Sequence, residues 1–99
     1  MVRTRREVVH RLMQFSKTRG QEFGVVRIGV FGSAARDKLT DRSDVDVVVE
    51  LAQPDLLLLV GIKQELEEVF GRPVDIVHYR PTMNAFLKRH IDHEAVYAS

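Results

Sequence analysis

The chain has 99 residues, no cysteine and a formal net charge of +1, with 44% apolar and 29% charged residues. These values fit one ordinary globular domain, residues 1–99, with a single modest core. The near-neutral charge argues against direct nucleic-acid or membrane binding, and the lack of cysteine excludes disulfides and cysteine-bound zinc. The N-terminus lacks the apolar segment of a secretory signal and no apolar run could span a bilayer, so we expect a cytoplasmic protein.

Apolar periodicity and turn residues predict helices that alternate with strands. In chain order, the predicted elements are a helix over residues 2–19, a strand over 25–31, a short helix over 33–38, a strand over 45–51, a helix over 55–70, a strand over 74–79 and a final helix from residue 84 towards Val96. We expect Gly20 and Gly71 to end the two long helices and Ser33 to cap the short one. This order predicts an α/β (α+β) fold, a small mixed sheet of three or four strands flanked by helices.

A run of leucines, residues 56–59, lies at the start of the helix predicted over residues 55–70. Further apolar residues follow along the same helix, so the run favours packing into the core. The apolar face is wide, which also leaves room for a partner helix.

Two aspartates, Asp44 and Asp46, stand at the start of the strand predicted over residues 45–51. Side chains two apart on a strand leave the same face, with backbones roughly 7 Å apart, so these like charges repel unless a cation lies between them. Magnesium suits such a place because it takes carboxylate and phosphate oxygens as ligands, and two such ions can serve an attacking and a leaving oxygen. Asp75, an isolated charge in the apolar strand predicted over residues 74–79, can complete the site.

A candidate phosphate site, Gly32 and Ser33, follows the strand predicted over residues 25–31. A side chain at position 32 would block the approach of a phosphate to the backbone, and the start of a helix favours anions. Arg36, one turn further on, can reach a phosphate. It can equally pair with a nearby aspartate, namely Asp37, Asp41 or Asp44. Gly-Ser and D-x-D are each weak signals alone, whereas their combination with Asp75 is specific.

The segment GSAARDKLTDRSDVDVVV resembles the signature of the nucleotidyltransferase fold of the DNA polymerase β superfamily. More narrowly, it is similar to the minimal nucleotidyltransferase (MNT) antitoxins of HEPN/MNT toxin–antitoxin pairs, whose pattern is GS, ten residues, then D-x-D. The ten residues are here 34–43, and the resemblance extends to Asp75 and to the closing segment Glu94 to Val96. It implies an antitoxin that transfers AMP from ATP to a tyrosine of a HEPN ribonuclease toxin.

The resemblance also implies a role for each matching residue. Gly32 and Ser33 would bind the triphosphate of ATP, and Arg36 is a further candidate for this site from its position in the sequence. Two magnesium ions would be held by the three aspartates Asp44, Asp46 and Asp75. The third aspartate, Asp75, is in addition the best candidate for the general base that activates the acceptor hydroxyl.

Two positions depart from the family pattern. Many relatives carry a glycine after the arginine of the first motif, where this chain has Asp37. The sequence therefore does not predict the conformation of that loop. Position 34 is often bulky or basic in relatives and is Ala34 here, so one substrate contact is expected to be absent.

Two other functions stay open at this point. The chain could neutralise a toxin by binding alone, using the fold only as a scaffold. It could instead be a nucleotidyltransferase for RNA ends or for small molecules such as aminoglycosides. The modest charge and the lack of an added substrate domain weigh against the latter, and the small size of the chain favours a partner protein that helps to enclose the nucleobase.

Overall fold

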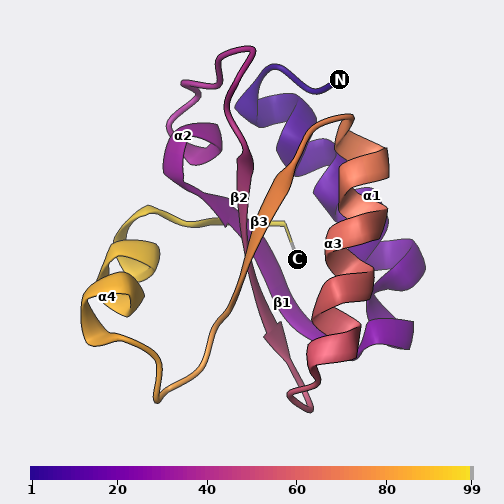
Figure 1. Ribbon diagram of the computed structural model, residues 1–99, viewed down its shortest axis with the longest axis vertical. Helices are drawn as coiled ribbons and strands as arrows, with labels where there is room; N and C mark the ends of the chain where they lie inside the picture. The colour runs from indigo at the N-terminus through magenta and orange to yellow at the C-terminus, as the bar shows by residue number, and fades with distance from the viewer. Residues whose placement is uncertain (99) are drawn as a thin grey trace.

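The computed structural model describes residues 1–98, in which a four-stranded sheet has helices on both sides (Figure 1). The strands are β1 (Val25–Phe31), β2 (Val45–Leu51), β3 (Val74–His78) and β4 (Val96–Tyr97), and the helices are α1 (Arg5–Phe23), α2 (Gly32–Ala35), α3 (Leu56–Phe70) and α4 (Ala85–Glu94). α1 and α3 lie side by side along one face of the sheet, and α4 lies on the other side. The predicted α/β (α+β) class is therefore confirmed.

None of the helices in residues 1–98 combines the length and the apolarity needed to cross a membrane.

The sheet is mixed, with the strand order β3-β2-β1-β4. β1 pairs antiparallel with both β2 and β4, while β2 and β3 run parallel. In this register Phe31 lies opposite Asp46, and Asp46 lies beside Asp75. The end of β1 and the starts of β2 and β3 consequently meet at one end of the sheet.

Strand β2 is buried on both of its faces. Val47 and Val49 belong to the main core under α1 and α3, whereas Val48 belongs to a smaller cluster with Ile91 of α4. Alternate residues of a strand face opposite sides, so two separate clusters account for an almost unbroken apolar strand. This double coverage holds the start of β2, and with it Asp46, in a fixed place.

Helix α1 begins and ends later than predicted. Thr4 caps its start by accepting the Glu7 N–H, and the expected stop at Gly20 is wrong because Gly20 is buried inside the helix. Gly24 ends the helix instead, in the left-handed conformation with φ of 70°. The reason lies in Phe23, whose ring packs against the core and keeps the last turn helical.

Helix α2 is shorter than predicted, and Ser33 does not cap it. The helix starts at Gly32, its cap position is Phe31, and no side chain forms a capping hydrogen bond. It ends at Ala35 rather than at residue 38. The serine hydroxyl is therefore not used by the helix start, contrary to the expectation from the sequence.

The loop after α2 turns at Asp37, which adopts a left-handed backbone with φ of 59°. Glycine is favoured in this conformation, and a non-glycine residue there needs a compensating contact. Asp37 has one, because its Oδ1 accepts the backbone N–H of Arg5 at 2.8 Å. The aspartate thus keeps the turn that a glycine would make and also ties it to the start of α1.

The last helix ends at Glu94, so the expected extension to Val96 is wrong. Ala95 has φ of −63° and ψ of 139°, which is extended backbone, and Val96 and Tyr97 then pair with β1 as β4. The sheet therefore reaches the upper end of the predicted three or four strands. A strand of two residues has no alternation of its own that a sequence could display.

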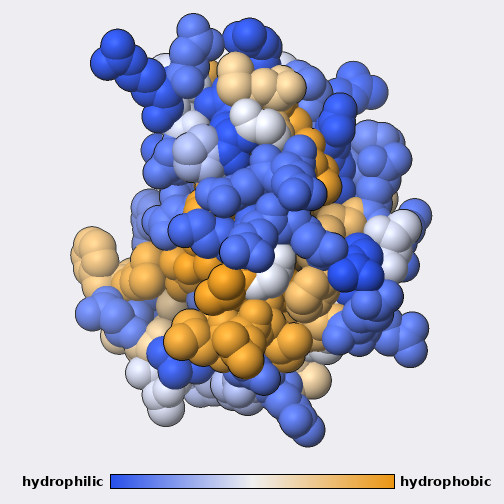
Figure 2. Space-filling model, turned by 45° about the vertical axis from the view of Figure 1, so that its right-hand side comes forward, coloured by the Kyte–Doolittle hydropathy of each residue, from blue (hydrophilic) through white to orange (hydrophobic). Residues whose placement is uncertain are grey.

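Helix α3 agrees with its prediction at both ends, since Asp55 caps it and Gly71 terminates it at φ of 69°. The core assignment of its leucine run is wrong for Leu56 and Leu57, which are 74% and 80% exposed. Successive helical residues are about 100° apart, so four in a row cannot all face the sheet. Figure 2 shows a hydrophobic area over the end of the molecule where α3 begins.

The exposure of the first turn of α3 predicts unequal effects of two leucine substitutions. Leu57→Ser should change the free energy of unfolding by less than about 0.5 kcal/mol, because the side chain is largely in solvent. Leu66→Ala should cost about 2–5 kcal/mol, because Leu66 is fully buried and leaves a cavity. Urea unfolding measures both values, and similar losses would show that the leucine run does pack into the core.

Candidate active site

The candidate site lies where three strands meet at one end of the sheet. Gly32 follows β1 directly, Asp46 is the second residue of β2 and Asp75 is the second residue of β3. Asp44 stands one position before β2 and is exposed, whereas Asp46 is half-buried. The fold thus brings together, from separate parts of the sequence, the glycine turn and the aspartates that the motifs predicted.

Gly32 is in direct contact with the carboxylate of Asp46. A Cβ built on Gly32 would overlap Asp46 Oδ2, and the backbone at Gly32 has φ of 65°. Both observations exclude a side chain here, because L-residues rarely adopt this conformation and the space is already taken. The backbone of the turn is therefore not covered by a side chain and lies beside a carboxylate. A phosphate could approach this backbone while its cation contacts the carboxylate.

Several negatively charged side chains act on the carboxyl group of Asp46. Burial raises the pKa of the Asp46 carboxyl above its ordinary value, and the charges of three other carboxylates, Asp75, Asp44 and Glu94, raise it further. Arg36 acts in the opposite direction but does not cancel these effects. An ionised Asp46 is consequently unfavourable unless a cation neutralises it.

The donor set fits magnesium, which prefers hard carboxylate oxygens. Within residues 1–98, no group of three or more histidine or acidic side chains already stands close enough together to hold an ion. Bringing three like charges together costs free energy, and a bound cation would offset that cost. The raised pKa of Asp46 and the bare turn at Gly32 are the observations that favour this interpretation.

Arg36 has a partner that the sequence did not suggest. It pairs neither with Asp37 nor with the other two nearby aspartates, but with Glu94 at the end of α4. The Glu94 side chain is only 15% exposed, and its second oxygen lies 2.8 Å from His90 Nε2. A guanidinium and a carboxylate from segments 58 positions apart are therefore paired beside the aspartates.

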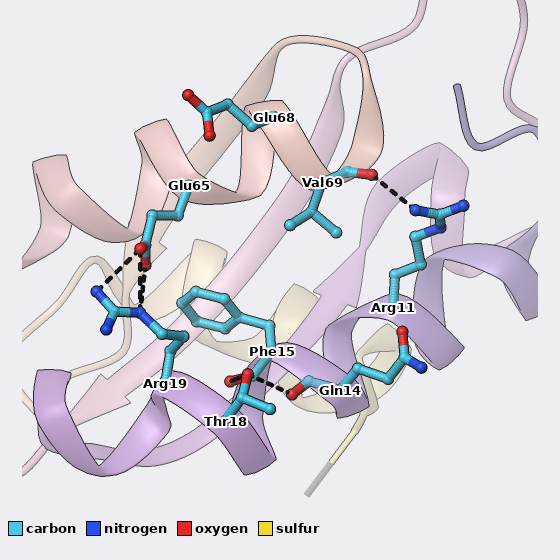
Figure 3. A pocket seen from close by; sticks show the side chains of 8 residues that line it. All are labelled: Arg11, Gln14, Phe15, Thr18, Arg19, Glu65, Glu68 and Val69. Carbon is cyan, nitrogen blue, oxygen red and sulfur yellow. Dashed lines mark hydrogen bonds and ion pairs between the residues drawn. The ribbon is translucent and has the colours of Figure 1, made fainter.

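A separate cavity of about 310 Å³ lies between α1 and α3 (Figure 3). Arg19 of α1 reaches across it to Glu65 of α3 at 2.9 Å, and Arg11 donates to the carbonyl of Val69. None of the candidate residues lines this cavity. Its polar groups join two helices to each other, so we assign it a structural role.

Comparison with known proteins identifies the enzyme class. The sequence profile of the nucleotidyltransferase domain matches residues 12–98, a span that includes every candidate residue. The chain belongs to this family. It is a nucleotidyltransferase, and the matched span includes the glycine turn and the paired aspartates.

Two relatives of this nucleotidyltransferase are protein adenylyltransferases by name. MJ0435 of Methanocaldococcus jannaschii, provisionally assigned as a protein adenylyltransferase, is 45% identical over 74 residues, which cover 74% of this chain and 78% of the relative. Protein adenylyltransferase MntA of Thermococcus cleftensis is 33% identical over 95 residues, which cover 95% of each chain. The matches cover most of the length of both relatives, 78% of MJ0435 and 95% of MntA.

Solved structures confirm the fold. A toxin–antitoxin structure with AMP-PNP superimposes with a TM-score of 0.75 at 18% identity, covering 92% of this chain and 72% of the other. A complex of a tri-AMPylated HEPN toxin from Shewanella oneidensis with its MNT antitoxin gives a TM-score of 0.59 at 18% identity, covering 88% and 71%. At these identities the likeness establishes the architecture of this nucleotidyltransferase and no more.

Glu94 is the residue beside the site to which sequence reasoning gave no role. Its segment carries the family resemblance but no predicted chemistry, and 58 positions separate Glu94 from Arg36. One signal could have drawn attention to it: Glu94 follows His90 by four positions, the spacing of an ion pair within a helix.

Proposed function

We propose that this chain is the antitoxin of a HEPN/MNT pair and transfers AMP from ATP to a tyrosine of its cognate HEPN ribonuclease toxin. The observation that carries the proposal is the meeting of Gly32, Asp46 and Asp75 at one end of the sheet. The name of the relative MntA and the solved complex of an MNT antitoxin with an AMPylated HEPN toxin support the choice of acceptor. We further propose that residues 1–99 form one minimal domain, since a single core cluster includes both Val2 and Ala98.

Each candidate residue has a task in this reaction. The backbone at Gly32 and Ser33, together with the Arg36 guanidinium, holds the triphosphate of ATP. The tyrosine oxygen forms a bond to the α-phosphorus, the bond between this phosphorus and the bridging oxygen to the β-phosphorus breaks, and pyrophosphate leaves. Asp75 accepts the proton of the tyrosine hydroxyl. The three aspartates would hold two magnesium ions, whose charge favours phosphoryl chemistry when they are bound.

The toxin also has a second task in this proposal, which is to complete the nucleotide site. The aspartates Asp44 and Asp75 are exposed, so the described part of the domain leaves this end of the sheet open. A partner that docks here would present its tyrosine and shield the reacting phosphate from water. We therefore expect a stable hetero-oligomer of antitoxin and toxin.

Labelled ATP offered to three classes of acceptor tests the proposal. The purified protein, magnesium and α-labelled ATP are incubated separately with the cognate HEPN toxin, with tRNA and with an aminoglycoside. We expect label in the toxin alone, and only with magnesium present. Label in tRNA or in the aminoglycoside would point to the alternative substrates, and neutralisation of the toxin without any label would point to binding alone.

A further inference from the structure

The contact between Arg36 and Glu94 joins the first motif to the last helix. Arg36 is the residue directly after α2, and its Nη1 donates to Glu94 Oε1. Glu94 is the last residue of α4, and its Oε2 lies 2.8 Å from His90 Nε2. The Glu94 carboxylate thus has two partner side chains: Arg36, which follows α2, and His90 within α4.

This pair is less exposed to solvent than an ordinary surface ion pair of residues 1–98. The two side chains of the exposed pair Arg3–Asp41, for example, are 65% and 84% exposed, and such pairs contribute little to stability. The Glu94 side chain is only 15% exposed, although its partner Arg36 is 54% exposed. A largely buried carboxylate therefore anchors an arginine that is itself half exposed to solvent.

The anchored arginine keeps most of its donors. A guanidinium has five N–H groups, and within residues 1–98 only Nη1 of Arg36 donates a hydrogen bond. The charges of both Arg36 and Glu94 act on Asp46, so the pair lies within electrostatic reach of the aspartates. The remaining donors are free to contact an anion at the glycine turn that begins α2.

We propose that Glu94 is a positioning residue that fixes the Arg36 guanidinium beside the phosphate site. The inference rests on the role proposed above for Arg36 in nucleotide binding. A free arginine loses side-chain entropy when it binds a phosphate, and an arginine already held by Glu94 has lost part of it beforehand. Glu94 therefore favours nucleotide binding although it carries the same sign of charge as the phosphate.

A double-mutant cycle with a binding measurement tests this inference. The variants are Glu94→Gln, Arg36→Ala and both together, and the readout is the Kd for AMP-PNP with magnesium by calorimetry, alongside the unfolding temperature. We expect Glu94→Gln to weaken binding about three- to tenfold and to have no further effect when Arg36 is already alanine. Glu22→Gln serves as the matched control, because it removes an exposed Glu–Arg pair on α1 and should leave the Kd unchanged.

The outcomes separate this inference from the proposed function. Unchanged binding in Glu94→Gln together with weaker binding in Arg36→Ala would overturn the positioning role and leave the proposed function intact. Independent effects that add up in the double variant would also overturn it. Unchanged binding in Arg36→Ala would overturn both the role of Arg36 and this inference, while AMP transfer to the toxin would still be tested by label. If Glu94→Gln does not fold, Glu94→Asp, which keeps the charge but withdraws it by one methylene, should show the same loss of affinity.

Discussion

Replacing Asp46 by asparagine is expected to abolish AMP transfer and, at the same time, to stabilise the metal-free protein at neutral pH. The loss of transfer should be about a thousandfold or more, because the carboxylate that faces the glycine turn can no longer help to hold a cation there. Rates of labelled AMP incorporation into the toxin measure this effect. Asp92→Asn is the control, since Asp92 is a carboxylate of α4 bonded to Tyr79 and Lys88 and should be dispensable for transfer. A rate within tenfold of the wild type in Asp46→Asn would contradict the assignment.

The gain in stability follows from the raised pKa of Asp46. A carboxyl whose pKa is higher in the folded state than in the unfolded state costs folding free energy once it ionises. The cost begins as the pH rises through the ordinary aspartate value, 3.8, and is complete above the raised pKa. Asp46→Asn should therefore unfold at a higher temperature than the wild type at about pH 7, and the difference should shrink towards about pH 4. Magnesium should stabilise the wild type and not the variant, and the reverse order of stabilities at neutral pH would refute the electrostatic account.

Gly32→Ala should damage both the fold and nucleotide binding. The backbone there is left-handed, with φ of 65°, and the added Cβ would overlap the Asp46 carboxylate. We expect a loss of about 1–3 kcal/mol in the free energy of unfolding, from backbone strain and from the displacement of Asp46. The Kd for AMP-PNP with magnesium should also rise by at least about tenfold, because the turn no longer presents a bare backbone to the phosphate.

Gly20→Ala is the matched control for this substitution. Gly20 lies inside α1, where an added Cβ would meet Ser16 Oγ at 3.5 Å and Val25 Cβ at 3.7 Å, which are ordinary contacts. Alanine is favoured over glycine in a helix by up to about 1 kcal/mol, so this variant should be as stable as the wild type or more so. Calorimetry should show a lower unfolding temperature than the wild type for Gly32→Ala and an equal or higher one for Gly20→Ala. An unchanged unfolding temperature in Gly32→Ala would mean that the turn is not constrained as described.

The parts of the fold that the sequence predicted best are those with strong local signals. The apolar runs at residues 25–31 and 45–51 end at glycine or at turn residues, and they predict the bounds of strands β1 and β2 as the structure has them. Strand β4 escaped prediction because its two residues gain their structure from pairing with β1 rather than from any local pattern. The stop of α1 was misplaced for a related reason: Gly20 and Gly24 are both acceptable locally, and the packing of Phe23 decides between them.

The candidate site shows the same division between local and long-range information. The spacing of Gly32, Asp44 and Asp46 was visible in the sequence, and the register of β2 with β3 brought Asp75 to the same end of the sheet as expected. The partner of Arg36 was not predictable, since Glu94 reaches it only through the position of α4 on the far side of the sheet. Ion pairs between distant segments depend on packing, which local patterns do not encode.

The intact mass of the cognate toxin tests the central claim most directly. The toxin is incubated with this protein, ATP and magnesium, and in parallel with the Asp44→Asn/Asp46→Asn double variant, whose binding to the toxin is verified first. We predict that the toxin gains mass in whole AMP residues on a tyrosine with the wild type and gains none with the double variant. An unmodified toxin that the wild type nevertheless inhibits, or equal modification by the double variant, would contradict the account.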